Sequence, residues 1–197
     1  SSPGLFAAFA SEIAVTTVDP DVLPGNAMVD LMLTGSFPLG AGVTLDATEA
    51  AEVFSVTLNG QAATFRNGGS GDTVAANSTT LYLTTPSLAL DMVEGEPVDT
   101  VVSLTVTDLR FTGNSLTVPE AATLKDSVTV TVEVSGNGTA TVAPASLEGN
   151  TNGGTYLKDT SLTVTFTADS GSELLTVLLD ETSIPTAVSS GMLSFTA

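Results

Sequence analysis

The segment VTVTVEV at residues 128–134 decides the fold class, because valine occupies every second position and polar residues fill the alternate ones. Residues 162–167 (LTVTFT) and 102–107 (VSLTVT) repeat this alternation. Successive side chains of a β-strand point to opposite faces, so each segment has one apolar and one polar face. Half-buried strands of this kind are typical of antiparallel sheets with one face on a core. The sequence therefore predicts an all-β protein.

Further short segments share this strand character and are separated by turn residues. The strand candidates are residues 12–18, 28–35, 53–58, 80–84, 115–118, 139–142, 174–179 and 192–196. Asn59-Gly60 is one of several Asn/Gly pairs between them, and such pairs favour tight hairpin turns. Short strands with turns at this spacing predict antiparallel β-sandwiches, in two modules, with an apolar strand at the N-terminus.

The best internal boundary is residues 119–124 (PEAATL), because proline cannot join a central ladder. We expect an N-terminal arm over 1–18, a β-sandwich over 19–120 and a small β-repeat module over 125–197. A single extended sandwich is the competing interpretation. Residues 46–52 carry Asp46 and Glu49 in capping-box spacing, which favours a two-turn helix or a turn leading into the next strand.

Charge excludes one class of partner. Arg66, Arg110, Lys125 and Lys158 are the only basic residues against 22 carboxylates, so the 197-residue chain carries a net charge of −18. Such a chain repels nucleic acid, and we expect no nucleic-acid partner. Apolar residues make up 42% of the sequence, enough for a folded core. The sequence contains no run of about 18 apolar residues, so it predicts no membrane span.

Catalytic chemistry is poorly supported, and we expect a protein that is not an enzyme. The chain has no cysteine and no histidine, which removes disulfides, Cys/His zinc sites and histidine general bases. It has no tryptophan, and Tyr82 and Tyr156 are the only tyrosines available to stack on a sugar ring. Lys125 and Lys158 are predicted to lie in polar turns, without an apolar pocket to activate them.

The C-terminal third has a recurring order of strands and turns, namely VTVTVEV, the turn GNG at 136–138, the GTY at 154–156, LTVTFT, and the turn ADSG at 168–171. In this order it resembles the small repeat modules of many bacterial surface proteins and adhesins. Residues 172–173 (SE) depart from it, because such modules usually carry an aromatic there. Residues 33–42 (LTGSFPLGAG) and 54–60 (FSVTLNG) more weakly resemble another secreted bacterial β-module. Both likenesses imply an extracellular or cell-surface protein without catalytic residues.

The N-terminal stretch is unusually apolar, with Leu5, Phe6, Phe9, Ile13 and Val15 close to the chain end. One interpretation is a first strand packed in its own sandwich. The other is a donor strand that fills a groove in the next copy, which propagates head to tail as a filament. This layout resembles donor-strand pilins and biofilm fibre subunits, which implies copies of the chain itself as partners. The alternative function is an adhesive module of a larger surface protein, with a surface glycan or cell-envelope partner.

Two further kinds of site are weaker candidates. Asp19, Asp21 and Asp30 could supply oxygens to Ca²⁺, although no EF-hand-type loop is present and solvated acidic turns are the simpler interpretation. We therefore expect no obligatory cofactor. Asn77 and Asn137 begin N-x-[ST] triplets, which are acceptors for N-glycosylation, in predicted loops.

Overall fold

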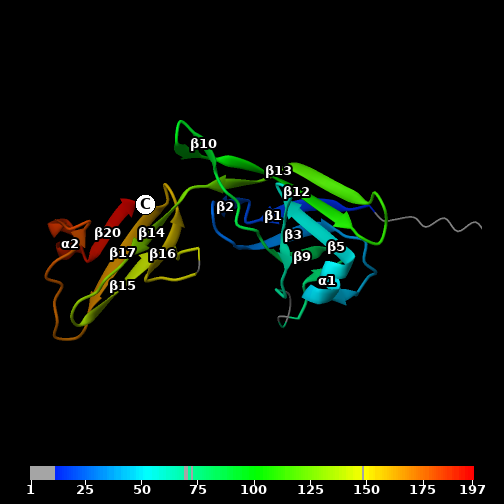
Figure 1. Ribbon diagram of the computed structural model, residues 1–197. Helices are drawn as coiled ribbons and strands as arrows, with labels where there is room; N and C mark the ends of the chain where they lie inside the picture. The colour runs from blue at the N-terminus through cyan, green and yellow to red at the C-terminus, as the bar shows by residue number, and fades with distance from the viewer. Residues whose placement is uncertain (1–11, 69–70, 72, 148) are drawn as a thin grey trace, which may run out of the picture. The chain divides into compact units, whose positions relative to one another are not determined.

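The computed structural model describes residues 12–68, 71, 73–147 and 149–197, and it confirms the all-β prediction. The chain divides into two compact units, Ser1–Lys125 (unit 1) and Asp126–Ala197 (unit 2). Figure 1 shows that strands make up most of the regular structure of each unit, with one short helix in the described part of each.

Unit 1 contains a first sheet of antiparallel strands. Its order is β1 (Ala14–Asp19), β3 (Asp30–Ser36), β9 (Thr80–Thr84), β8 (Ala76–Asn77) and β4 (Thr44–Leu45), with β7 (Thr64–Phe65) also paired to β9. β1 is therefore an edge strand whose partner is β3 of the same unit.

The second sheet of unit 1 is mixed. Its order is β2 (Val22–Pro24), β13 (Ser115–Lys125), β12 (Thr100–Asp108), β5 (Phe54–Leu58) and β6 (Gln61–Ala62). Only β2 runs parallel to its neighbour, β13. β10 (Asp91–Val93) and β11 (Glu96–Val98) form a separate hairpin. β5 and β6 meet at Asn59-Gly60, whose φ angles of 47° and 78° suit a tight hairpin turn.

The core of unit 1 lies between these two sheets. Leu31 and Leu33 of β3 contribute from the first sheet, and Val102, Leu104 and Val106 of β12 contribute from the second; all five are fully buried. The intervening residues of both strands are more exposed. Alternation read from the sequence thus corresponds to a sandwich with two inner faces.

The predicted boundary at residues 119–124 lies within β13, which runs through it to Lys125. Across from β12, Val118 pairs with Leu104 and Ala122 pairs with Val102, so residues 119–121 lie opposite the single residue Ser103. Pro119 is accommodated in this irregularity of the ladder, where a missing N–H is tolerated. The two units instead divide between Lys125 and Asp126.

Of the helix and the turn that the sequence left open near residue 46, the helix forms, as α1 (Ala47–Val53). Asp46 Oδ1 accepts hydrogen bonds from the backbone N–H groups of Thr48 and Glu49, both at 2.9 Å. Glu49 Oε2 accepts in return from the Asp46 N–H at 3.0 Å. This reciprocal capping box satisfies backbone donors that the first turn leaves free. It therefore stabilises a helix here in preference to a turn.

Unit 2 is built from smaller sheets. β14 (Ser127–Thr131) pairs with β16 (Gly153–Leu157), β17 (Ser161–Ala168) lies between β15 (Gly138–Ala143) and β20 (Met192–Thr196), and β18 (Leu178–Leu179) pairs with β19 (Thr182–Ser183). The strand predicted over 174–179 is reduced to the two residues of β18.

A short helix that the sequence did not predict, α2 (Pro185–Ser190), completes unit 2. Pro185 begins the helix, and Gly191 ends it with a left-handed φ of 68°. The core of unit 2 is formed by Val142, Tyr156, Leu162 and Val164, with the valines of residues 128–132 packed against it.

Candidate functional site

The structure describes two of the five residues predicted to form the N-terminal arm, Ile13 and Val15. Ile13 is 4% exposed and belongs to the core of unit 1, and Val15 packs against the same core. β1 pairs with β3 from Ala14 opposite Ser36 to Asp19 opposite Met32, which fixes this part of the arm in its own unit. Leu5, Phe6 and Phe9 lie outside the described residues.

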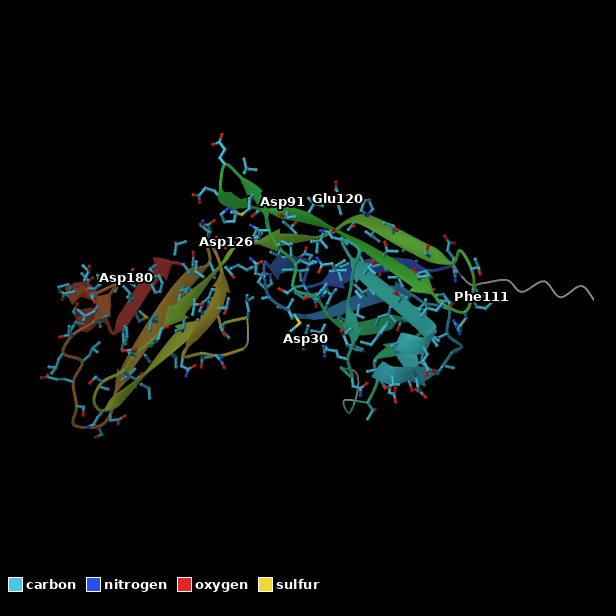
Figure 2. All side chains as sticks on the ribbon, viewed as in Figure 1. Asp30, Asp91, Phe111, Glu120, Asp126 and Asp180 are labelled. Carbon is cyan, nitrogen blue, oxygen red and sulfur yellow. The ribbon has the colours of Figure 1, made fainter. Side chains whose placement is uncertain are left out.

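The three predicted calcium ligands are not brought together. Asp30 Oδ1 lies 3.1 Å from Arg66 Nε and 3.4 Å from Thr84 Oγ1, so it is engaged within the first sheet. No group of three or more acidic side chains close enough to hold a metal ion occurs in the described part of the chain, which includes Asp19 and Asp21. Figure 2 shows Asp30, Asp91 and Glu120 on separate elements of unit 1.

The two glycosylation triplets differ in their surroundings. The side-chain oxygen of Asn77 accepts hydrogen bonds from the N–H groups of Thr79 and Thr80 and from the Thr79 hydroxyl, at 2.8, 2.9 and 3.0 Å. Asn77 therefore organises the turn between β8 and β9. Asn137 is exposed in the turn before β15, and its backbone carbonyl accepts from the Asp169 N–H at 3.2 Å. Modification of either side chain stays a prediction.

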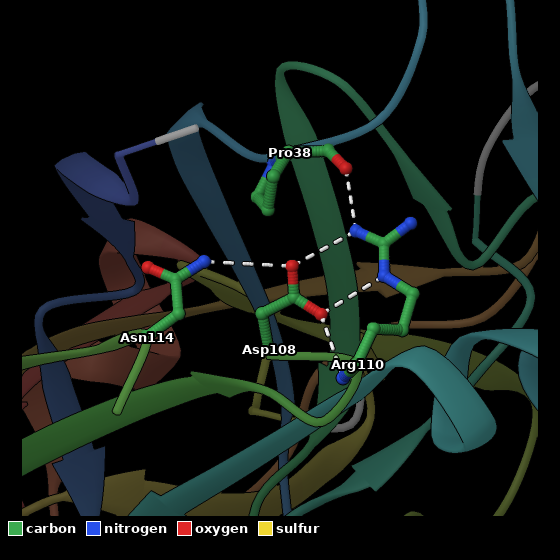
Figure 3. A network of polar contacts seen from close by, with 4 residues as sticks. All are labelled: Pro38, Asp108, Arg110 and Asn114. Atoms are coloured by element: carbon green, nitrogen blue, oxygen red, sulfur yellow. Dashed lines mark hydrogen bonds and ion pairs between the residues drawn. The ribbon is translucent and has the colours of Figure 1, made fainter. Parts of the chain in front are cut away.

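A buried carboxylate that the sequence analysis missed lies at the end of β12. Asp108 is fully buried, and Figure 3 shows Arg110, Asn114 and Pro38 around it. Arg110 Nε donates to Asp108 Oδ1 and Arg110 Nη2 donates to Asp108 Oδ2, both at 2.9 Å. The Arg110 backbone N–H donates to Oδ1 at 3.1 Å, and Asn114 Nδ2 lies 3.5 Å from Oδ2.

These contacts determine the charge state of Asp108. Burial alone raises the pKa of a carboxyl group. At Asp108 the hydrogen bonds from the Arg110 side chain and backbone, together with the positive charge of Arg110, outweigh this effect of burial. The pKa of Asp108 is therefore lowered, and the pKa of Arg110 is raised mainly by the same hydrogen bond. The carboxylate is ionised and has both oxygens occupied, which suits a structural clamp.

The clamp joins separate parts of unit 1. Arg110 Nη2 donates to the Pro38 carbonyl at 2.6 Å, and the guanidinium carbon lies 5.9 Å from the ring centroid of Phe54. Phe54 in turn meets Phe37 edge to face at 6.2 Å. The sequence does contain a signal for Asp108. Asp108 continues the every-second-residue series of the inward-facing Val102, Leu104 and Val106, and it lies two residues before an arginine.

All four basic side chains of the protein are paired with carboxylates. Arg66 contacts Asp30, Arg110 contacts Asp108, and the amines of Lys125 and Lys158 lie 3.6 and 3.7 Å from Asp99 and Asp126. The lysine pairs are exposed and contribute little to stability. They nevertheless leave no cationic patch, so the negative charge of the surface is relieved only locally.

An apolar groove lies in unit 1 where α1 meets β5 and β7. It has a volume of about 370 Å³. Phe54, Val56 and Phe65 are buried beneath it, while Ala51 and Leu109 are exposed beside it. Figure 1 shows α1 next to the start of β5, where the groove is located. None of its lining residues is charged, and Ser55 and Thr64 are the two polar ones, so the groove suits an uncharged and largely apolar occupant.

Comparison with known proteins does not identify a relative. No protein-family model matches the chain, and no curated protein matches it. Within the described residues, neither α1 nor α2 is long and apolar enough to cross a membrane.

Proposed function

We propose that the chain is a structural subunit of an extracellular filament or pilus-like surface fibre. Its copies join head to tail through the apolar segment at residues 5–10 (LFAAFA). The observation that carries the proposal is the position of Ile13. The buried cluster of unit 1 extends from Ile13 to Leu124, so β1 belongs to its own sandwich, and this proposal therefore assigns donation to the part that precedes β1.

Charge supports an apolar contact between copies. Each chain carries a net charge of −18, and its four basic side chains are already paired within their own units. Copies therefore repel each other, most strongly at low salt. Residues 1–11 contain no charged side chain. Burying Leu5, Phe6 and Phe9 in another copy removes apolar surface from water without bringing carboxylates together.

One observation favours a second candidate, a non-catalytic adhesive module of a larger cell-surface protein. Two of the five residues assigned to the arm, Ile13 and Val15, lie in their own sandwich. A monomeric module needs no donated strand, and the absence of a metal cluster among the described residues is compatible with binding through loops or strand edges. A surface glycan or cell-envelope component is then the partner class.

The test is negative-stain electron microscopy of the full chain beside two triple variants. In the first variant, Leu5→Glu, Phe6→Glu and Phe9→Glu place charge in the apolar segment. In the matched control, Ser1→Glu, Ser2→Glu and Ser11→Glu add the same charge to the same stretch. We expect filaments from the full chain and the serine control, and single particles from the first variant. Single folded particles from all three would favour the adhesive module.

A further inference from the structure

We propose that the groove between α1, β5 and β7 receives residues 5–10 of a second copy. This inference rests on the proposed filament and assigns the surface into which the donated segment inserts. Both partners in the contact then belong to unit 1, one as the donor and the other as the acceptor.

The groove has the shape and chemistry of a receptor for bulky apolar side chains. Three alanines, Ala47, Ala51 and Ala63, line it and leave room above the buried Phe54 and Phe65. Leu109, also in its lining, is 53% exposed although it is apolar. An occupant that covers Leu109 and fills the space over Phe54 would remove apolar surface from water, which is the main driving force of association.

A short stretch of strand edge without a partner strand borders the same groove. β5 pairs with β12 along its whole length, from Phe54 to Leu58. On its other edge, β6 pairs only with Thr57 and Leu58, and one further backbone bond joins the Ala63 N–H to the Val56 carbonyl. Within the described residues, no strand covers this edge from Phe54 to Ser55. The Phe54 N–H already donates to the Ala50 carbonyl, so an extended segment that enters the groove can reach only the remaining backbone groups of this short edge, and its side chains supply most of the contact.

The segment at residues 5–10 matches this receptor. In an extended chain Leu5, Ala7 and Phe9 share one face. Leu5 and Phe9 are then about 14 Å apart, with the small Ala7 between them. A bulky–small–bulky face suits a groove with a buried aromatic floor and alanine walls. The segment is free of charge, as is the groove lining, so insertion buries no unpaired ion.

Cysteine crosslinking tests this contact, and the natural chain has no cysteine to confuse the result. Leu5→Cys, Phe6→Cys and Phe9→Cys are each combined with Ala51→Cys in the full chain. The matched control replaces Ala51→Cys by Val101→Cys, because Val101 is 56% exposed on β12 and does not line the groove. Each double variant is oxidised under assembly conditions and run on a denaturing gel without reductant.

We expect a ladder of covalent oligomers from at least one pair with Ala51→Cys, and monomers from the Val101→Cys pairs. A faster-migrating crosslinked monomer would mean that the segment folds onto its own groove, which overturns the proposal. Filaments without any crosslink to Ala51→Cys would place the receptor elsewhere and leave the proposed function intact. Neither filaments nor crosslinks would overturn both.

Blocking the groove gives an independent readout. Ala51→Trp fills the space that the donated side chains need, whereas Ala62→Trp adds the same ring to the exposed neighbouring strand β6 outside the lining. We expect Ala51→Trp to abolish filaments with the melting temperature of unit 1 retained, and Ala62→Trp to assemble normally. Normal assembly of a folded Ala51→Trp variant would contradict the assignment of this groove.

Discussion

Unit 1 and unit 2 use the same alternating strands, yet their cores differ in size. Among the described residues, the core cluster of unit 1 contains twenty buried residues, whereas that of unit 2 contains four. Leu175 and Leu178 of unit 2 are 75% and 57% exposed. Alternation therefore reports which face of a strand is apolar but not how deep a core that face joins. Since small domains bury less of their surface, we expect unit 2 to be the less stable unit.

The largest effect is expected from Phe54→Ala in unit 1. Phe54 is 1% exposed and contacts both Phe37 and Arg110, so its removal leaves a cavity that neighbouring strands cannot close. We expect a loss of about 3–5 kcal/mol in the free energy of unfolding of unit 1. Urea unfolding followed by Tyr82 fluorescence measures it in a Tyr156→Phe background, because the chain has one tyrosine in each unit and no tryptophan.

Leu162→Ala is the corresponding change in unit 2. Leu162 is 1% exposed, and its loss is expected to cost about 2 kcal/mol, because neighbours in a thin core can close over the gap. Tyr156 fluorescence in a Tyr82→Phe background follows this unit. The Tyr82 signal should be unaffected by Leu162→Ala. Equal shifts of both signals would mean that the units unfold together and that their comparison does not hold.

We expect the stability of unit 1 to fall more than that of unit 2 at low pH, because of Asp108. Its pKa is lowered in the folded protein, so it contributes stability that is present above the unfolded value of about 3.9 and is lost as pH falls through the lower folded value. Asp108→Asn should cost unit 1 about 1–3 kcal/mol at neutral pH and flatten this acid dependence. Arg110 is 38% exposed and can be rehydrated, which limits the cost.

Melting curves of unit 1 between pH 7 and pH 2.5, with and without Asp108→Asn, measure this difference. Among the described residues, unit 2 buries no carboxylate, so its melting temperature should change less over the same range. An unchanged acid response in the Asp108→Asn variant would show that other carboxylates cause it.

Much of the fold follows from local sequence, and the exceptions share a physical cause. The alternation in β12 and the capping box at Asp46 depend on neighbours along the chain; the first predicted the strand correctly, and the second indicated a helix as one of two alternatives, the one that forms. β13 passes through Pro119 because of an irregularity opposite Ser103, which depends on a partner strand. The Asp108 clamp needs the Pro38 carbonyl, and the groove needs α1, β5 and β7 together, so neither was accessible from local pattern.

The smallest effect is expected from Asp46→Ala, which removes the side-chain cap of α1. It should cost unit 1 about 1 kcal/mol, the usual value for an N-cap. Glu52→Ala is the matched control, because it removes one exposed charge from the same helix outside the capping box. α2 in unit 2 has no side-chain cap, so no substitution there can remove an equivalent capping contribution to stability. Equal effects of the two substitutions would assign the loss to charge and not to capping.

The central claim is that the N-terminal stretch changes its role just before Ile13, from assembly to the core of its own unit. The most direct measurement compares two truncated chains, one lacking residues 1–11 and one lacking residues 1–15, by electron microscopy and by melting of unit 1. The account predicts that the first forms no filaments but keeps the melting temperature of unit 1, and that the second loses stability as well. Filaments from the first chain, or equal destabilisation of both, would contradict it.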